Sequence, residues 1–144
     1  MTATDEPISL APIMNCFEGL VPAVIATASS DGTPNVTHLS KVHYVDDDHV
    51  ALSNQFFSKT MRNLAENPRA SVVLVDPTAY GVWKLELRYE RTERRGPVFD
   101  KMHRDIELVA ALTGMAGVFK LKSADIYRVV DLQQVRTAWS TQGQ

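Results

Sequence analysis

Cysteine is almost absent from this 144-residue chain, in which Cys16 stands alone. A single cysteine forms no internal disulfide, so the chain is no disulfide scaffold, and we expect a reducing, cytoplasmic setting. Cys16 lies beside Phe17 in an apolar stretch, which favours a buried structural thiol. No apolar run approaches the ~20 residues of a membrane span. The opening residues lack the charge and apolar run of a secretory signal, so we expect neither a signal nor a membrane partner.

A strong excess of one charge is missing as well. Fifteen Lys and Arg residues against seventeen Asp and Glu residues give a net charge of -2. Nucleic-acid binders usually carry a basic excess, so we predict no nucleic-acid partner. The hydrophobic share of 44% and the charged share of 22% are those of an ordinary globular protein. Length and composition therefore indicate one domain with its own core.

What the chain does contain is a series of patterns typical of strands. The first two strands are predicted to form a hairpin, because Asp31-Gly32 supplies a positive φ and Pro34 suits the first position of a strand. Residues 35–45 alternate as a single strand, and with the strands before and after them they predict an antiparallel meander. The predicted strands cover residues 21–29, 35–45, 49–54, 69–76, 83–93 and 117–135.

Three helices are predicted between these strands. Residues 8–18 have the spacing of a short amphipathic helix, and Ser58 is a good N-cap for a second one that ends at Asn67-Pro68. The third covers residues 98–113, between Gly96-Pro97 and a terminating Gly114. Six strands and three helices in this order predict a mainly β (β+α) fold, a closed or nearly closed six-stranded antiparallel barrel with a few flanking helices.

The segment Ser58-Lys59-Thr60 carries the strongest chemical signal. The first turn of a helix offers free backbone N–H groups and about half a positive charge, which attract anions. Two hydroxyl groups and the Lys59 ammonium lie in that turn, with Arg62 nearby, so the segment is a candidate phosphate cradle. The alternative is a plain helix start, in which Ser58 only caps the helix and Lys59 is solvated.

Metal and hydrolase chemistry find little support. The histidines lack the convergent spacing of a zinc site, so we predict no metal site. Asp46-Asp47-Asp48 lacks the spacing of a calcium loop and predicts a solvated hairpin turn. No Gly-x-Ser-x-Gly motif is present. The four histidines are His38, His43, His49 and His103.

Residues 19–76 resemble the pyridoxamine 5'-phosphate oxidase-like family of FMN-binding split barrels. The resemblance depends on an ordered set of features and continues more loosely to about residue 130. These features are the strand–Asp-Gly-x-Pro–strand opening, the polar strand end at Ser53-Asn54, the helix start at Ser58-Lys59-Thr60, and Asn63-Leu64 followed by Asn67-Pro68.

The resemblance implies a split β-barrel that forms a homodimer with FMN at the subunit interface. It divides the chain into an N-terminal helical segment (1–18), the FMN-binding barrel (19–132) and a polar tail or linker (133–144). The strand at residues 37–41 would lie along the flavin ring, largely through backbone groups. The strand end at residues 53–54 would reach the ribityl chain and phosphate, and residues 58–60 would bind the phosphate.

One further position is implied near the ring, where Glu86 or Lys84 stands in place of a glutamine that is common in the oxidases. The implied cofactor-binding residues are Thr37, His38, Leu39, Ser40, Lys41, Ser53, Asn54, Gln55, Ser58, Lys59, Thr60 and Glu86.

The leading functional prediction is an FMN-binding oxidoreductase acting on an unidentified small molecule, with the chemistry supplied by the cofactor. Genuine pyridoxamine phosphate oxidase activity is not expected, because the arginine-rich ending of the vitamin B6 oxidases is missing and Arg136 and Trp139 lie in a polar tail. One alternative is a non-catalytic, flavin-binding sensory module of a larger signalling protein. Another is the same fold holding the deazaflavin F420, or haem with an axial histidine such as His38 or His43.

Overall fold

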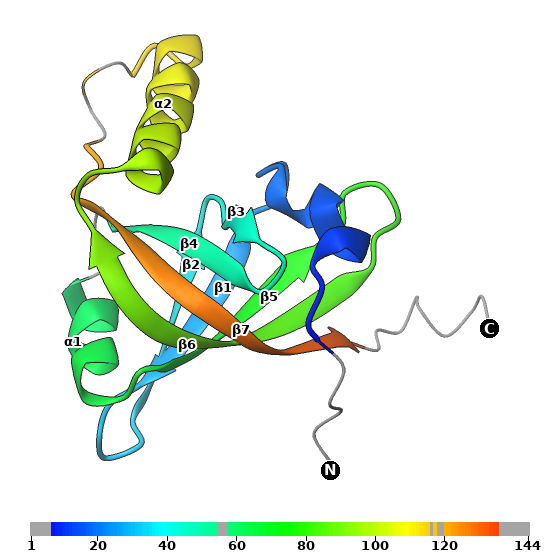
Figure 1. The fold of residues 1–144 in the computed structure, drawn as a ribbon, viewed down its shortest axis with the longest axis vertical. Helices are drawn as coiled ribbons and strands as arrows, with labels where there is room; N and C mark the ends of the chain where they lie inside the picture. Colours follow the sequence, from blue (N-terminus) through cyan, green and yellow to red (C-terminus); the bar gives the residue numbers. More distant parts are fainter. Residues whose placement is uncertain (1–6, 55–57, 116, 118–119, 136–144) are drawn as a thin grey trace.

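A computed structural model describes residues 7–54, 58–115, 117 and 120–135, which form a curled sheet flanked by helices (Figure 1). None of the helices in this part of the chain is long and apolar enough to cross a membrane. The elements in chain order are the 3-10 helix η1 (Ala11–Phe17), β1 (Ala23–Ala28), β2 (Pro34–Leu39), β3 (His43–Asp46), β4 (His49–Asn54), α1 (Ser58–Glu66), β5 (Arg69–Val75), β6 (Val82–Glu93), α2 (Pro97–Leu112) and β7 (Ser123–Val135).

The seven strands form one antiparallel sheet in the order β2-β1-β5-β6-β7-β4-β3. Its two edge strands, β2 and β3, follow each other in the chain and are separated only by residues 40–42. So short a connection reaches at most about 14 Å, so the sheet has to curl until its two edges approach each other (Figure 1). The predicted mainly β antiparallel barrel is confirmed, with seven strands rather than six.

The extra strand arises because residues 35–45 form two strands where the sequence predicts one. Val42 and His43 are both buried, although consecutive side chains of one strand point to opposite faces. The chain therefore leaves the β1 edge after Leu39 and joins β4 at the other edge. Both antiparallel pairings of the predicted meander are present, β1 with β2 and β3 with β4, but its middle strand is divided between the two edges of the sheet.

The main core fills the inside of the barrel. Along β1, Ala23, Ile25 and Thr27 are buried and alternate with half-exposed residues, as expected for a strand with one face inward. Leu10 and Ile13 of the η1 region are fully buried and pack into this core. Each such side chain contributes about 1.5–3 kcal/mol. The helix predicted at residues 8–18 is therefore present as the shorter 3-10 helix η1.

The only cysteine packs into the same core. Cys16 is buried, as predicted. Burial, with a smaller contribution from the Asp76 charge, raises the pKa of its thiol to about 11. The thiol is therefore protonated at neutral pH, and a structural role follows, because only the thiolate is strongly nucleophilic.

Helix α2 builds a second, smaller core beside the barrel. It begins after Gly96, whose φ of 107° suits glycine, and has Pro97 in its first turn, close to the predicted start. Met102 is almost fully buried and packs with Ala51 and Ile126 of the sheet. The helix projects from one end of the barrel (Figure 1). Side chains of α2 can therefore contribute to a site at that end of the barrel.

Candidate functional site

The first turn of α1 is attached to the hairpin formed by β1 and β2. Asn35 of β2 donates a hydrogen bond from Nδ2 to Thr60 Oγ1 at 3.3 Å. One helical turn later, Asn63 Nδ2 donates to Thr27 Oγ1 of β1 at 3.1 Å. Thr27 and Asn35 are themselves cross-strand partners. The structure thus brings the predicted phosphate-binding turn against β2, the strand that carries predicted flavin-lining residues, through a contact between residues 25 positions apart.

Within that turn the side chains divide into buried and exposed ones. Thr60 is buried, and its hydroxyl accepts the Asn35 hydrogen bond, whereas Lys59 and Arg62 are exposed. The first turn of α1 holds no acidic residue. An anion at this helix start would therefore meet two cations and free N–H groups without a competing carboxylate from the turn. The Ser58 side chain and Gln55 lie outside what the structure describes.

Strand β2 presents its predicted site residues in three different ways. Leu39 is buried in the core, so it can face a cofactor only through its backbone. Thr37 is half-buried, and His38 and Ser40 are exposed. Because β2 is an edge strand that pairs only with β1, its outer row of N–H and C=O groups is not used by the sheet. Such a row can bind the edge of a flat polar ring.

The polar strand end at Ser53 and Asn54 closes β4, opposite Ala124 and Ser123 of β7. Asn54 is half-buried, and its carbonyl accepts a hydrogen bond from the Lys122 N–H at 3.0 Å. Only three residues separate Asn54 from the start of α1. The strand end and the helix start are therefore within about 14 Å of each other along the chain.

Glu86 lies farther away, on the outer face of β6. It accepts a hydrogen bond from Ser71 Oγ at 2.6 Å, and Lys84 Nζ is 3.4 Å from its other oxygen. Cross-strand pairing places Glu86, Ser71, Ala26 and Val36 in one row across β6, β5, β1 and β2. Three strand spacings, about 14 Å, thus separate Glu86 from β2. Within one chain the structure does not bring Glu86 to the predicted flavin-lining strand.

A cavity of about 460 Å³ opens where β2 ends, which is within the usual range of ligand pockets. Lys41 Nζ lies 3.7 Å from Asp105 Oδ2 of α2, and His43 Nδ1 lies 3.8 Å from the same oxygen. The lining residues come from η1, the β2–β3 connection, β3 and α2; they are Met14, Asn15, Phe17, Glu18, Lys41, His43, Tyr44, Lys101 and Asp105.

The histidine in this cavity is held neutral. His43 is only 7% exposed, and burial is the main reason that its pKa is lowered to about 4. The positive charges of Lys41 and Lys101 lower this pKa further, and only Asp105 opposes them. At neutral pH the cavity therefore combines two ammonium groups with an uncharged imidazole. His43 and Asp105 are not among the residues that the sequence marks as cofactor-binding, because nothing in their spacing indicates that they meet.

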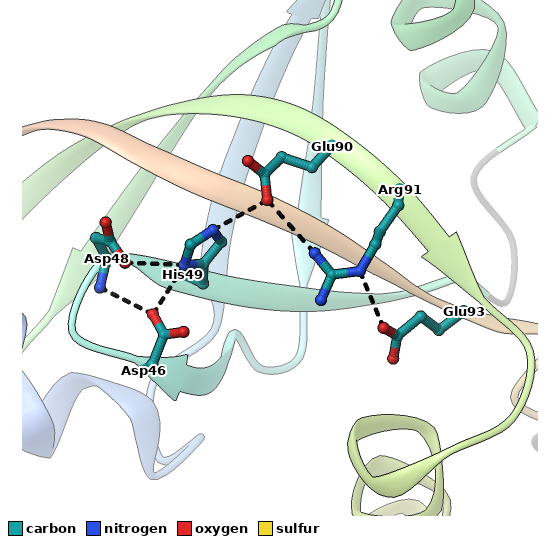
Figure 2. Close-up of polar contacts among 6 residues, drawn as sticks. All are labelled: Asp46, Asp48, His49, Glu90, Arg91 and Glu93. Atoms are coloured by element: carbon teal, nitrogen blue, oxygen red, sulfur yellow. Dashed lines mark hydrogen bonds and ion pairs between the residues drawn. The ribbon is translucent and has the colours of Figure 1, made fainter.

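A second polar cluster surrounds His49 on β4, the strand that pairs with β3 (Figure 2). His49 Nδ1 lies 2.8 Å from an oxygen of Asp46 and 2.8 Å from one of Asp48, and Nε2 lies 2.9 Å from Glu90 Oε1. Glu90 is the extra residue of a bulge in β6, where the register shifts between Tyr89 and Arg91. A bulge re-aims the side chain it carries, and here the Glu90 carboxylate reaches His49 on β4.

These carboxylates favour the protonated form of His49 and raise its pKa. Partial burial alone would lower the pKa of His49, but the hydrogen bond to Asp46 and the charges of Asp46, Asp48 and Glu90 outweigh it and raise the pKa. Asp46 and Asp48 lie at the turn that the sequence predicts. The three ligand-type atoms of Asp46, Asp48 and His49 lie within 4.8 Å of one another, and the contacts of His49 Nδ1 with both carboxylates account for that proximity.

Comparison with known proteins agrees with this architecture. The family pattern described as pyridoxamine 5'-phosphate oxidase matches residues 13–127. The uncharacterized protein MJ0282 of Methanocaldococcus jannaschii is 38% identical over 50 residues, which are 33% of this chain and 34% of that protein. The chain thus aligns with about a third of the length of that relative.

Solved structures share the fold at low sequence identity. An FMN-binding protein from Syntrophomonas wolfei has a TM-score of 0.70 and 15% identity, over 83% of this chain and 80% of that one. An F420 reductase has a TM-score of 0.59 and 14% identity, over 90% and 98% of the two chains. HutZ, the haem storage protein from Vibrio cholerae, has a TM-score of 0.58 and 14% identity, over 89% and 95%.

At such identities these likenesses show the fold alone. They demonstrate that one barrel architecture occurs in proteins described as binding FMN, as an F420 reductase and as storing haem. The family match is of a different kind, because it covers most of the chain, from η1 through the middle of β7. The chain therefore belongs to the pyridoxamine 5'-phosphate oxidase-like family of split-barrel proteins.

Proposed function

We propose that this protein binds FMN and acts as a flavin-dependent oxidoreductase on a small molecule. The observation that carries the proposal is the hydrogen bond between Asn35 and Thr60, which joins an edge strand to the first turn of a helix. A flavin mononucleotide needs both parts, a surface for a flat polar ring and a site for a phosphate. Family membership supports the same cofactor.

The phosphate end fits the start of α1. Lys59 and Arg62 are exposed there, and the first turn carries no carboxylate. The N–H groups of the first turn lack partners within the helix, so they are free to donate to phosphate oxygens. Asn35 and Asn63 hold the turn against the β1–β2 hairpin through their hydrogen bonds. The phosphate site would thus be rigid before the cofactor arrives.

The ring end fits β2. Its outer backbone groups are available for hydrogen bonds with a heterocycle, and Thr37 can add a hydroxyl. When bound, FMN supplies hydride or electron transfer, and the protein supplies binding, orientation and the local charge. The cavity beside Lys41 lies at the end of this strand and is the space in which a small substrate would meet the ring. His43 itself adds no charge to this cavity at neutral pH, because its pKa is lowered to about 4.

A homodimer completes the proposed site. Val36 is 64% exposed on the outer face of β2, and its row continues through Ala26 and Ser71 to Glu86. The second copy would cover Val36 at the β2 end of this row. Glu86 is too far from β2 of its own chain to reach the ring, so it would approach the flavin bound mainly by the other copy.

Titration with FMN tests the proposal. Lys59→Ala should weaken FMN binding by roughly 1.5–3 kcal/mol, the range for a hydrogen bond to a charged group. Arg104→Ala, which removes an exposed cation from α2, is the matched control and should leave the dissociation constant unchanged. Equal affinity of the Lys59 variant and the wild type would contradict the phosphate site. Failure of the wild type to take up FMN would contradict the function.

The absorption spectrum of the purified protein distinguishes the alternative cofactors. Absorption bands near ~450 nm indicate flavin, a single band near ~420 nm indicates the deazaflavin F420, and a Soret band indicates haem. Anaerobic mixing with NADH or NADPH then distinguishes an oxidoreductase, whose flavin is bleached, from a sensory module, whose flavin stays oxidised. F420 or haem uptake in preference to FMN would replace the proposed cofactor and leave the fold assignment intact.

A further inference from the structure

The side chain of Lys41, in the β2–β3 connection, is held from two sides by segments outside that connection. A Cβ placed on Gly19, which follows η1, would lie 3.2 Å from Lys41 Cδ and 3.3 Å from Cγ, so the lysine stem runs directly along the Gly19 backbone. At the far end, Lys41 Nζ lies 3.7 Å from Asp105 Oδ2 of α2. The φ of Gly19 is +78°, a value that favours glycine.

A lysine held in this way is unusual because the side chain is long and flexible. Ordering its four-carbon stem costs up to about 2 kcal/mol of entropy, and an exposed ion pair alone seldom repays that cost. Here the stem packs against the backbone and the ammonium lies beside a half-buried carboxylate. Lys101 lines the same cavity but has no ion pair with any residue that the structure describes. The cavity therefore contains one lysine held by two contacts and one exposed lysine.

We propose that Gly19 and Asp105 are positioning residues that fix the charge of Lys41 beside the flavin ring and so favour the reduced cofactor. The inference rests on the proposed function, which places the ring along residues 37–41. Reduction adds negative charge to the flavin, and a cation held nearby stabilises that form, because charge near the ring nitrogens tunes flavin electronics. Helix α2, through Asp105, is thereby linked to the chemistry without touching the cofactor.

The midpoint potential of bound FMN tests this inference. Lys41→Met should weaken the preference for reduced over oxidised FMN about tenfold, which is ~30 mV for a two-electron couple. Lys101→Met, which removes the exposed lysine of the same cavity, is the matched control and should change the preference by less than about threefold. Equal shifts from the two variants would overturn the idea that a fixed position of Lys41 matters.

Asp105→Asn is the most informative variant, because two explanations of its role predict opposite shifts in the midpoint potential of bound FMN. If Asp105 acts by positioning Lys41, the potential falls, as it does in Lys41→Met. If Asp105 acts only through its own negative charge, removing that charge raises the potential. A rise, or no change, would overturn the proposal. FMN affinity is measured alongside, so that loss of cofactor binding, which contradicts the proposed function, is distinguished from an unchanged potential.

A measurement without cofactor tests the positioning itself. Relaxation of the lysine ammonium groups by NMR reports their order on the ps–ns timescale. Lys41 should be more ordered than Lys101 and Lys59 in the cofactor-free protein, and Asp105→Asn should abolish the difference. Gly19→Ala should also reduce the order of Lys41, whereas Gly32→Ala should not, because that glycine shares the positive φ but has no atom within 4 Å of its Cβ position. A mobile Lys41 in the wild type would overturn the proposal whether or not FMN binds.

Discussion

Two histidines on the β3–β4 hairpin, six residues apart, have pKa values shifted in opposite directions. His43 on β3 is almost fully buried beside two lysines, and its pKa is lowered to about 4. His49 on β4 is 22% exposed in its side chain and has three carboxylates within 2.9 Å, and its pKa is raised. The comparison teaches that position in a strand does not determine the charge of a histidine. Burial and the charge of Lys41 lower the pKa of His43, whereas three carboxylates, one of them re-aimed by the β6 bulge, raise the pKa of His49.

The largest expected effect comes from placing a permanent charge at each position. His43→Lys should lower the free energy of unfolding by roughly 3–5 kcal/mol, because it leaves a charge buried beside two existing cations. His49→Lys should cost less than about 1 kcal/mol, since a cation there still faces carboxylates. Urea unfolding at pH 7 measures both. Similar losses in the two variants would show that the two environments do not differ as described.

An intermediate effect is expected from acid. The folded pKa of His43, about 4, lies below the unfolded value of ~6.5, so the unfolded chain binds more protons between these values. Stability attributable to His43 is therefore present at neutral pH and is lost as pH falls from 6.5 toward 4. Between pH 7.5 and 5 the loss should be about 2 kcal/mol. His43→Gln should remove this part of the pH dependence, and an unchanged slope in the variant would contradict a neutral His43.

The smallest expected effect is the pH dependence of stability that comes from His49, and its direction is opposite to that of His43. The folded pKa of His49 lies above its unfolded value, so its contribution is fully present below pH ~6.5 and is lost as pH rises through the folded pKa. His49→Gln should cost about 1 kcal/mol at pH 6, the scale of a hydrogen bond to a charged group, and less as pH rises through the folded pKa. His103→Gln, at an exposed site with a single ion pair to Glu107, is the control. A wild-type advantage that grows with pH would contradict a protonated His49.

Local sequence signals predicted most of the fold. The Asp31-Gly32 turn, Pro34 at the start of β2, the helix beginning at Ser58 and the helix after Gly96 are all present. Each of these depends on a few neighbouring residues, which a sequence displays directly. The break after Leu39 has no such local signal, because residues 40–42 contain no glycine or proline and their sequence predicts a continuing strand. Only the need of β3 to pair with β4 separates it from β2.

Some parts of the candidate site could likewise be predicted from local sequence, and others could not. Residues 58–60 could be singled out because a helix start and a lysine are adjacent in sequence. The meeting of Lys41 with Asp105, and of His49 with Glu90, joins residues 64 and 41 positions apart. The first depends on how α2 is placed at the barrel end, and the second on a bulge that adds one residue to β6. Neither leaves a pattern in the local sequence, since both are set by tertiary packing.

The central claim is that FMN lies along β2 with its phosphate at the start of α1. Residue-resolved amide NMR of the protein during FMN addition tests it most directly. The account predicts that the largest shifts occur at residues 58–60 and 37–41, with little change around Asp48 and His49. Largest shifts at the His49 cluster, or no shift at residues 58–60, would contradict it.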